Sequence, residues 1–256
     1  YDTRVAQDEE TYSEDAAGFE SAMTSGTLVT WMPEGYRTVK HILVIPDASV
    51  LDPYTQKKDE LDALNENLAT LNEDLTAATD DDASDADPAA IEQQIAQAQQ
   101  DIADAEAELA TLEQACFDDV QDTLDEIYAR IDAGEDFDAL IAEYGEDPGM
   151  QNEPTASSGY YVCADSTTWD TAFRDAAMLL SNVGDVSDPV LGMSGVHIIR
   201  YESDVTAGAV PFEQVRDELS EETLTRMREE NYDALLQEWV DALNPVYHYD
   251  AWDPTA

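Results

Sequence analysis

The spacing of apolar residues changes several times along the chain, and each change predicts a different kind of element. Residues 39–45 (VKHILVI) are apolar on both faces of an extended chain, which predicts a central strand of a sheet. From about Pro53 the leucines recur at intervals of three and four residues, which is the a/d pattern of a coiled coil. These leucines are Leu61, Leu64, Leu68, Leu71 and Leu75.

A second apolar seam begins at Ile91 and continues without a break to Ile131. It predicts one helix from about Ala89 to Asp132, with a length of about 65 Å at 1.5 Å per residue. The stretch between the seams, residues 79–88, is rich in Asp and ends in Pro, which predicts a turn. Two helices with so short a linker favour an antiparallel hairpin, although pairing between two chains remains an alternative.

The rest of the chain alternates short helices and strands. Glycines bound a short amphipathic helix at 137–144, and the Asp-Pro-Gly sequence at 147–149 predicts a turn. We expect a helix in the first part of 1–36, strands at 159–164, 186–191 and 196–201, helices at 169–180 and 210–243, and a short strand near 246–252. This mixture predicts an α+β fold.

Composition narrows the classes of partner. The 256 residues contain 59 Asp and Glu against 11 Lys and Arg, a net charge of -48, so the surface repels nucleic-acid phosphates and anionic lipid headgroups. We expect neither nucleic-acid binding nor direct membrane insertion, since no apolar run is long enough to cross a bilayer. The acidity can attract cationic clients, but it also suits a salty or calcium-rich exterior without any specific partner.

Cysteine and histidine usage points away from a metal site. The two cysteines, Cys116 and Cys163, could form one disulfide. The histidines at 41, 197 and 248 do not have the spacing of zinc ligands, so we expect no metal and no cofactor. The chain begins at Tyr1, without an initiator Met or a signal peptide, so either a leader has been removed or the chain has been trimmed.

With the hairpin set aside, the order of elements becomes strand, helix, helix, turn, short strand, helix, strand, strand. In this order the chain resembles the parvulin family of peptidyl-prolyl isomerases. The segments that carry the resemblance are VKHILV at 39–44, AGEDFDALIAEYGEDPG at 133–149, AFRDAAMLL at 172–180 and GDVSDPVLGMSGVHIIRY at 184–201. The resemblance implies a four-stranded antiparallel sheet with surrounding helices, and a shallow apolar site for a proline ring.

The resemblance also implies the residues of the site. It places His41 and His197 side by side on central strands as catalytic residues together with Tyr160. The proline ring would contact Phe173, with Trp169, Met178 and Leu43 completing its pocket. Four positions depart from the family pattern. Tyr160 stands where the family has Cys or Asp, and Trp169 stands where it has Met or Leu. Gly192 stands where it often has Thr or Ser, and Ser158 stands where it has a second glycine.

The segments on either side resemble the helical flanks of PrsA/SurA-type foldases, through PEGYRTVKHILV at 33–44 and PFEQVRDEL at 211–219. The expected organisation is an N-terminal flank (1–36), an isomerase domain (37–51 with 118–205), an inserted helical hairpin (52–117) and a C-terminal flank (206–256). The resemblance implies an extracytoplasmic location, either secreted or lipid-anchored at the outer face of the cell membrane, and it implies that the flanks pack together as a chaperone module.

Two functions follow from these residues. The first is an isomerase and foldase that acts on X-Pro bonds of newly exported polypeptides, favoured by His41, Phe173 and His197. The second is a chaperone or binding protein in which the fold has lost catalysis and the hairpin contacts clients, favoured by Tyr160, Trp169 and Gly192. A histidine on an apolar strand is often only a core residue, but two of them at the family's positions favour a site.

Overall fold

A four-stranded antiparallel sheet organises the centre of the molecule. The computed structural model describes residues 1–80 and 87–243, so most of the predicted acidic turn and the predicted C-terminal strand lie outside the described residues. The sheet has the order β3-β2-β5-β4 and consists of β2 (Arg37–Val44), β3 (Tyr160–Val162), β4 (Val190–Gly192) and β5 (Gly195–Asp204). The predicted α+β fold with this sheet is confirmed.

The central strand β2 is buried along almost its whole length, as its two apolar faces predict. It pairs with β5 so that Leu43 lies opposite His197 and His41 lies opposite Ile199. A register shift between Thr38 and Val39 interrupts this pairing near the start of the strand. The two longest strands of the sheet therefore carry one histidine each, on neighbouring positions.

Helices α5 (Phe137–Tyr144) and α8 (Thr171–Leu179) cover the sheet, and the short helices α6 (Pro148–Gln151) and α7 (Thr155–Ser158) link α5 to β3. The predicted limits of α5 agree with the structure residue for residue. Gly134 follows the preceding helix with a φ of 80°, a left-handed conformation that favours glycine at a helix end. Phe137, Leu140 and Ile141 bury the inner face of α5 in the main core.

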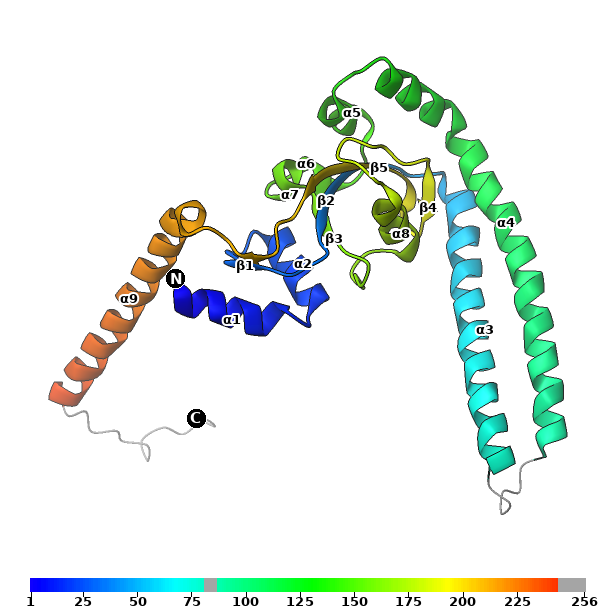
Figure 1. Cartoon of the computed structure of the whole chain (residues 1–256), viewed down its shortest axis with the longest axis horizontal. Coiled ribbons are helices and arrows are strands. Elements are labelled where there is room, and N and C mark those ends of the chain that lie inside the picture. Colours follow the sequence, from blue (N-terminus) through cyan, green and yellow to red (C-terminus); the bar gives the residue numbers. More distant parts are fainter. Residues whose placement is uncertain (81–86, 244–256) are drawn as a thin grey trace, which may run out of the picture.

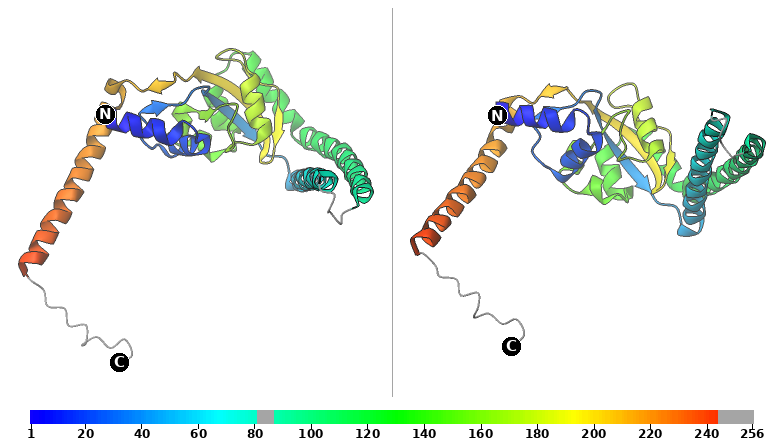
Figure 2. Two further views of the ribbon diagram at one scale, coloured as in Figure 1. Left: turned by 60° about the horizontal axis from the view of Figure 1, so that its bottom comes forward. Right: turned by 90° about the horizontal axis from the view of Figure 1, so that it is seen from below.

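The predicted hairpin is present as α3 (Ala48–Asp80) and α4 (Pro88–Asp132), which run side by side and project from one end of the molecule (Figures 1 and 2). Helix α3 begins five residues earlier than predicted and contains Pro53 in its second turn. Helix α4 begins with Asp87 as its N-cap and Pro88 in its first turn. Its C-terminal part buries Cys116, Leu124 and Ile127 in the main core, so one continuous helix joins the hairpin to the sheet domain.

The N-terminal flank forms a smaller core against the sheet. Helices α1 (Asp2–Tyr12) and α2 (Ala16–Ser25) precede β1 (Trp31–Met32), which pairs with β6 (Gly208–Ala209) in a two-stranded sheet. Phe19 is fully buried in this smaller core together with Tyr36 and Cys163. Cys116 belongs to the main core instead, and both thiols are free. The disulfide that the two cysteines could form is therefore not present in the structure.

The C-terminal flank is one long helix, α9 (Phe212–Leu243), that extends away from the opposite end of the molecule (Figures 1 and 2). Its apolar residues predicted a packing face, but Val215 is the one buried residue of the helix, and Trp239 is 64% exposed. The described parts of the two flanks meet at the pair of β1 and β6 and near the start of α9, where the ring of Tyr1 contacts that of Phe212 and Arg4 pairs with Glu222. Among the described residues, the expected packing of the two flanks into one module is therefore limited to the pair of β1 and β6 and the first turns of α9. Among the described residues, no helix has both the length and the apolarity needed to cross a bilayer.

Candidate active site

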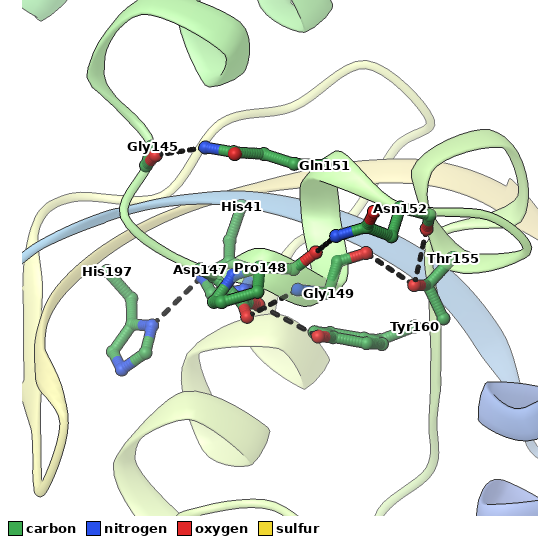
Figure 3. Close-up of polar contacts among 10 residues, drawn as sticks. All are labelled: His41, Gly145, Asp147, Pro148, Gly149, Gln151, Asn152, Thr155, Tyr160 and His197. Atoms are coloured by element: carbon green, nitrogen blue, oxygen red, sulfur yellow. Dashed lines mark hydrogen bonds and ion pairs between the residues drawn. The ribbon is translucent and has the colours of Figure 1, made fainter.

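Two buried histidines face each other across the central strands. The side chains of His41 on β2 and His197 on β5 approach within 3.0 Å between their Nδ1 atoms (Figure 3). This contact follows from the pairing of Leu43 with His197. His41 lies two residues before Leu43 on β2, so its side chain is on the same face of the sheet as those of Leu43 and His197. One Nδ1 must donate and the other must accept, so the two rings cannot both carry a proton on the shared side.

Asp147 extends this contact into a chain of hydrogen bonds. Its Oδ2 lies 2.7 Å from Nε2 of His41 and accepts from the hydroxyl of Tyr160 at 2.8 Å (Figure 3). Its Oδ1 accepts from the backbone N–H of Gly149 at 2.9 Å, which caps α6. An ionised carboxylate only accepts, so Nε2 of His41 donates to it. The chain therefore runs from Tyr160 and Asp147 through His41 to His197.

Sequence reasoning assigned Asp147 to a turn and did not include it among the site residues. The resemblance suggested that Tyr160 replaces the acid of the family's site, yet the structure supplies a carboxylate from a segment 13 residues earlier in the chain. A usable signal was present in the sequence: Asp before Pro-Gly marks a helix N-cap, and the segment that contains it follows directly on α5.

Side chains of α6 and α7 hold the Asp147 segment in place. Gln151 donates to the carbonyl of Gly145 at 2.6 Å, and Asn152 donates to the carbonyl of Pro148 at 2.7 Å (Figure 3). The hydroxyl of Thr155 donates to the carbonyl of Gly149. These bonds satisfy carbonyls on both sides of Asp147, so its carboxylate is oriented by the surrounding backbone before any ligand binds.

The electrostatics of Asp147 favour its ionised form. Burial raises the pKa of this carboxyl, but the hydrogen bonds from His41, Gly149 and Tyr160 together with the charge of His41 outweigh burial, so the pKa falls to about 2. Burial and the neighbouring carboxylate raise the pKa of Tyr160, which therefore stays protonated and donates. Asp147 is thus a fixed negative charge of the site near neutral pH.

His197 is neutral at physiological pH. Burial, and to a smaller extent the charge of His41, lower its pKa to about 3, against a weaker opposing effect of Asp147. Such a ring is too weak a base to take up a proton at neutral pH. Its Nε2 makes no hydrogen bond within the described part of the chain, and it faces Gly192, where an added Cβ would lie 3.2 Å from it. Gly192 therefore keeps space open beside this nitrogen.

The histidine pair forms part of the wall of a cavity of about 260 Å³. The ring of Phe173 lies 5.1 Å from that of His41 and 5.2 Å from that of His197, and the ring of Trp169 lies 4.4 Å from that of Tyr160. Trp169 is anchored by a hydrogen bond from its Nε1 to the carbonyl of Tyr161 at 2.8 Å. The lining residues are His41, Leu43, Asp147, Tyr160, Thr168, Trp169, Asp170, Phe173, Ser194 and His197.

The structure thus brings together six of the seven residues expected at the site. Met178 does not line the cavity and instead packs, partly buried, against the main core. Besides Asp147, three lining residues with polar side chains were not expected: Thr168, Asp170 and Ser194. The family often has a Thr or Ser hydroxyl near the last turn, where this chain has Gly192. Ser194 supplies a hydroxyl in the same turn.

The sequence of this region is similar to that of known proteins. Residues 113–203 match the family model of the PPIC-type PPIase (rotamase) domain. Foldase protein PrsA of Clostridium botulinum is 26% identical over 122 residues, which cover 48% of this chain and 35% of that protein. Foldase protein PrsA 3 of Bacillus cereus is 36% identical over 97 residues, covering 38% of this chain and 32% of that protein. The matches therefore span about a third of the length of these relatives.

A crystal structure of the peptidylprolyl isomerase PrsA from Bacillus cereus aligns with 17% identity and a TM-score of 0.28, covering 96% of this chain and 88% of that one. That score is too low to support the fold, which rests instead on the order of the strands and on the matched segment. From these two observations, the chain contains a parvulin-type, or PPIC-type, peptidyl-prolyl isomerase domain that is similar to the one in PrsA foldases.

Proposed function

We propose that this chain is a peptidyl-prolyl cis-trans isomerase that acts as an extracytoplasmic foldase on X-Pro bonds of exported polypeptides. The observation that carries the proposal is the hydrogen-bonded chain from Asp147 through His41 to His197 in the wall of an apolar cavity. A chain of polar groups this well satisfied fixes the shape of the cavity wall, and Phe173 and Leu43 supply apolar surface for a proline ring.

The reaction asks for shape and polarity rather than for a nucleophile. Rotation about an X-Pro bond breaks amide resonance, with a barrier of roughly 20 kcal/mol, and no covalent bond forms or breaks. The enzyme must bind the twisted amide more tightly than either planar isomer. The twisted amide is less polar than the planar one, so a desolvated cavity lined by Phe173, Trp169 and Leu43 favours it.

In this proposal the histidines organise the cavity and do not transfer protons. His197 is too weak a base for that role, since its pKa lies near 3. The carboxylate of Asp147 fixes the orientation of His41, and His41 fixes His197. The hydroxyls of Tyr160 and Ser194 and the free Nε2 of His197 remain as polar groups that can orient the peptide around the prolyl bond.

The foldase part of the proposal rests on the relatives and on the charge of the chain. The relatives are named as foldases, and the strongly acidic surface keeps the protein soluble and repels nucleic acid. We infer unfolded, newly exported polypeptides as clients. We also propose four units: flanks at 1–36 and 206–256, an isomerase domain at 37–51 with 118–205, and a hairpin at 52–117 whose inner ends pack with the isomerase domain through Tyr54, Leu109 and Leu112.

The test is an NMR exchange assay on a panel of X-Pro peptides with wild type, Phe173→Leu and His197→Gln. We expect wild type to accelerate isomerisation and both variants to lose most of the acceleration, because one loses ring contact and the other alters the histidine pair. Phe212→Leu, on an aromatic residue that is 43% exposed and far from the site in sequence, serves as the matched control and should keep full activity.

Folding of each variant is checked by its amide NMR spectrum, so that loss of activity is not confused with loss of structure. If folded wild type accelerates no X-Pro peptide in the panel, the isomerase proposal fails. The chain would then be a parvulin-fold binding protein, and the hairpin of α3 and α4 would be the first surface to examine for partners.

A further inference from the structure

A second cavity, of about 430 Å³, lies where the α1–α2 connection, the β1–β2 connection and the segment after β3 meet. Three aromatic residues line it: Tyr12 and Trp31 are half-buried, and Tyr36 is buried. The faces of such rings carry negative electrostatic potential and attract organic cations. The aromatic lining makes this cavity suitable for the head group of a Lys or Arg side chain.

The charged residues that line this second cavity are all acidic. They are Glu14, Glu34 and Asp165, and all three are exposed. Among the residues that the structure describes, no Lys or Arg lines the cavity to neutralise them. Carboxylates that surround an aromatic wall attract a cation and reject an anion, so the charge agrees with the chemistry of the rings.

A buried carboxylate, Glu20, is hydrogen-bonded to Tyr36, which is one of the residues of this wall. Glu20 is only 1% exposed, and its Oε1 accepts from the hydroxyls of Tyr36, at 3.2 Å, and Ser166. Its Oε2 has no hydrogen-bond partner among the described residues, which is unusual for a buried oxygen. Tyr36 lines the cavity, and so does Cys163, whose Sγ lies 3.5 Å from Oγ of Ser166, whereas Glu20 itself is not a lining residue. The cavity therefore adjoins an acceptor that the fold leaves unsatisfied.

We propose that this second cavity binds a Lys or Arg side chain of the same polypeptide whose X-Pro bond occupies the active-site cavity. The proposal rests on the isomerase function proposed above. One segment lines both cavities, with Asp165 in the second and Thr168 in the first. Three residues of chain span at most about 11 Å, so the linings of the two cavities approach each other within that distance. An extended client therefore needs at least about three residues to pass from one cavity to the other.

The expected consequence is a preference among clients. A basic residue three to five positions from the proline should strengthen binding of the planar and twisted forms equally, because the second cavity is remote from the amide. Uniform binding lowers KM and leaves kcat unchanged. A cation–π contact plus exposed ion pairs is worth on the order of 1 kcal/mol, which corresponds to a roughly fivefold lower KM.

The experiment compares peptides that contain one proline and, three to five residues away on either side, Lys or the uncharged norleucine. We expect wild type to show a KM about fivefold lower for the lysine peptide, and Glu34→Gln/Asp165→Asn to lose this difference. The matched control is Glu66→Gln/Glu73→Gln, which removes the same charge from exposed positions on α3. Equal KM values for both peptides in wild type, or an equal loss in the control, would overturn the proposal.

A direct binding measurement separates this proposal from the isomerase proposal. The indole NMR signal of Trp31, assigned with Trp31→Phe, is followed during titration with N-acetyl-lysine amide and with N-acetyl-norleucine amide. A concentration-dependent shift that is larger with the lysine compound than with the norleucine compound supports the cation site even if no peptide is isomerised. Isomerisation without either the shift or the KM preference leaves the isomerase function intact and removes the cation site.

Discussion

Burial of a neutral histidine at the site should make the stability of the sheet domain depend on pH. The pKa of His197 falls from 6.5 to about 3 when the protein folds, so below pH 6.5 the unfolded chain binds a proton that the folded protein excludes. Stability linked to this ring is therefore complete above pH 6.5 and declines as the pH falls from 6.5 toward 3. This direction is the reverse of that for a histidine that gains an acidic partner.

The magnitude at pH 5 depends almost entirely on the unfolded pKa. At pH 5 the unfolded ring is nearly fully protonated and the folded ring is nearly fully neutral, and the pH lies 1.5 units below 6.5. At about 1.4 kcal/mol per pH unit, the loss of stability between pH 7.5 and pH 5 is about 2 kcal/mol.

The perturbation is His197→Gln, which removes the titrating group and keeps a side chain that can hydrogen-bond. Urea unfolding of wild type and variant is followed at pH 7.5 and pH 5.0 by Trp169 fluorescence, with Trp31, Trp239 and Trp252 replaced by Phe in both proteins. The sequence pI of about 4.1 keeps the chain anionic at both pH values. A fixed ionic strength of about 0.15 M limits long-range effects of the acidic surface.

The quantity of interest is the difference between the two pH-dependent losses, so the stability cost of the substitution itself cancels. We expect wild type to lose about 2 kcal/mol more than His197→Gln between the two pH values, with equal m-values in all four experiments. Equal losses in the two proteins would refute the reasoning, because they would mean that the fold does not keep His197 neutral.

Three further predictions concern the same domain. Tyr160→Phe should cost about 1 kcal/mol in urea unfolding by removing the hydroxyl that donates to Asp147, whereas Tyr232→Phe, at a position that is 65% exposed, should cost nothing measurable. Gly149→Ala should displace the Tyr160 hydroxyl, since the new Cβ would lie 1.8 Å from it, and should reduce isomerisation of X-Pro peptides with changed NMR shifts at the site; an unchanged spectrum and rate would contradict this. Replacing residues 58–107 with a short flexible loop should leave the domain folded with wild-type activity and one cooperative unfolding transition, and loss of that cooperativity would show that the hairpin is not autonomous.

The proposed cut for the hairpin comes from the structure. The sequence suggested 52–117 as the insert, but Tyr54 is buried in the main core, and Leu109 and Leu112 pack against it. Lys57 and Glu108 face each other across the hairpin with a distance of 2.8 Å between Nζ and Oε2. A loop that joins Lys57 to Glu108 therefore keeps Tyr54, Leu109 and Leu112, which pack in or against the main core.

Elements with a long apolar period could be predicted closely from the sequence. The limits of α4 and α5 and the central position of β2 follow from patterns that extend over many residues. The pair of β1 and β6 could not be predicted, because two residues are too few to show any period. The sequence also could not show that most apolar side chains of α9 stay exposed within the described part of the chain, because periodicity indicates a face that can pack and does not indicate what lies against it.

The site shows the same distinction between local and long-range information. His41, Phe173 and His197 could be found because a family pattern spans the strands and helix that carry them. Asp147 has a complete local explanation as the cap of α6, and that explanation concealed its second role. One carboxylate oxygen caps the helix while the other accepts from His41 and Tyr160, so the turn and the site are one structure. A substitution that removes this carboxylate should therefore disturb the fold of the loop and the histidine pair together, whereas His197→Gln alters the pair alone.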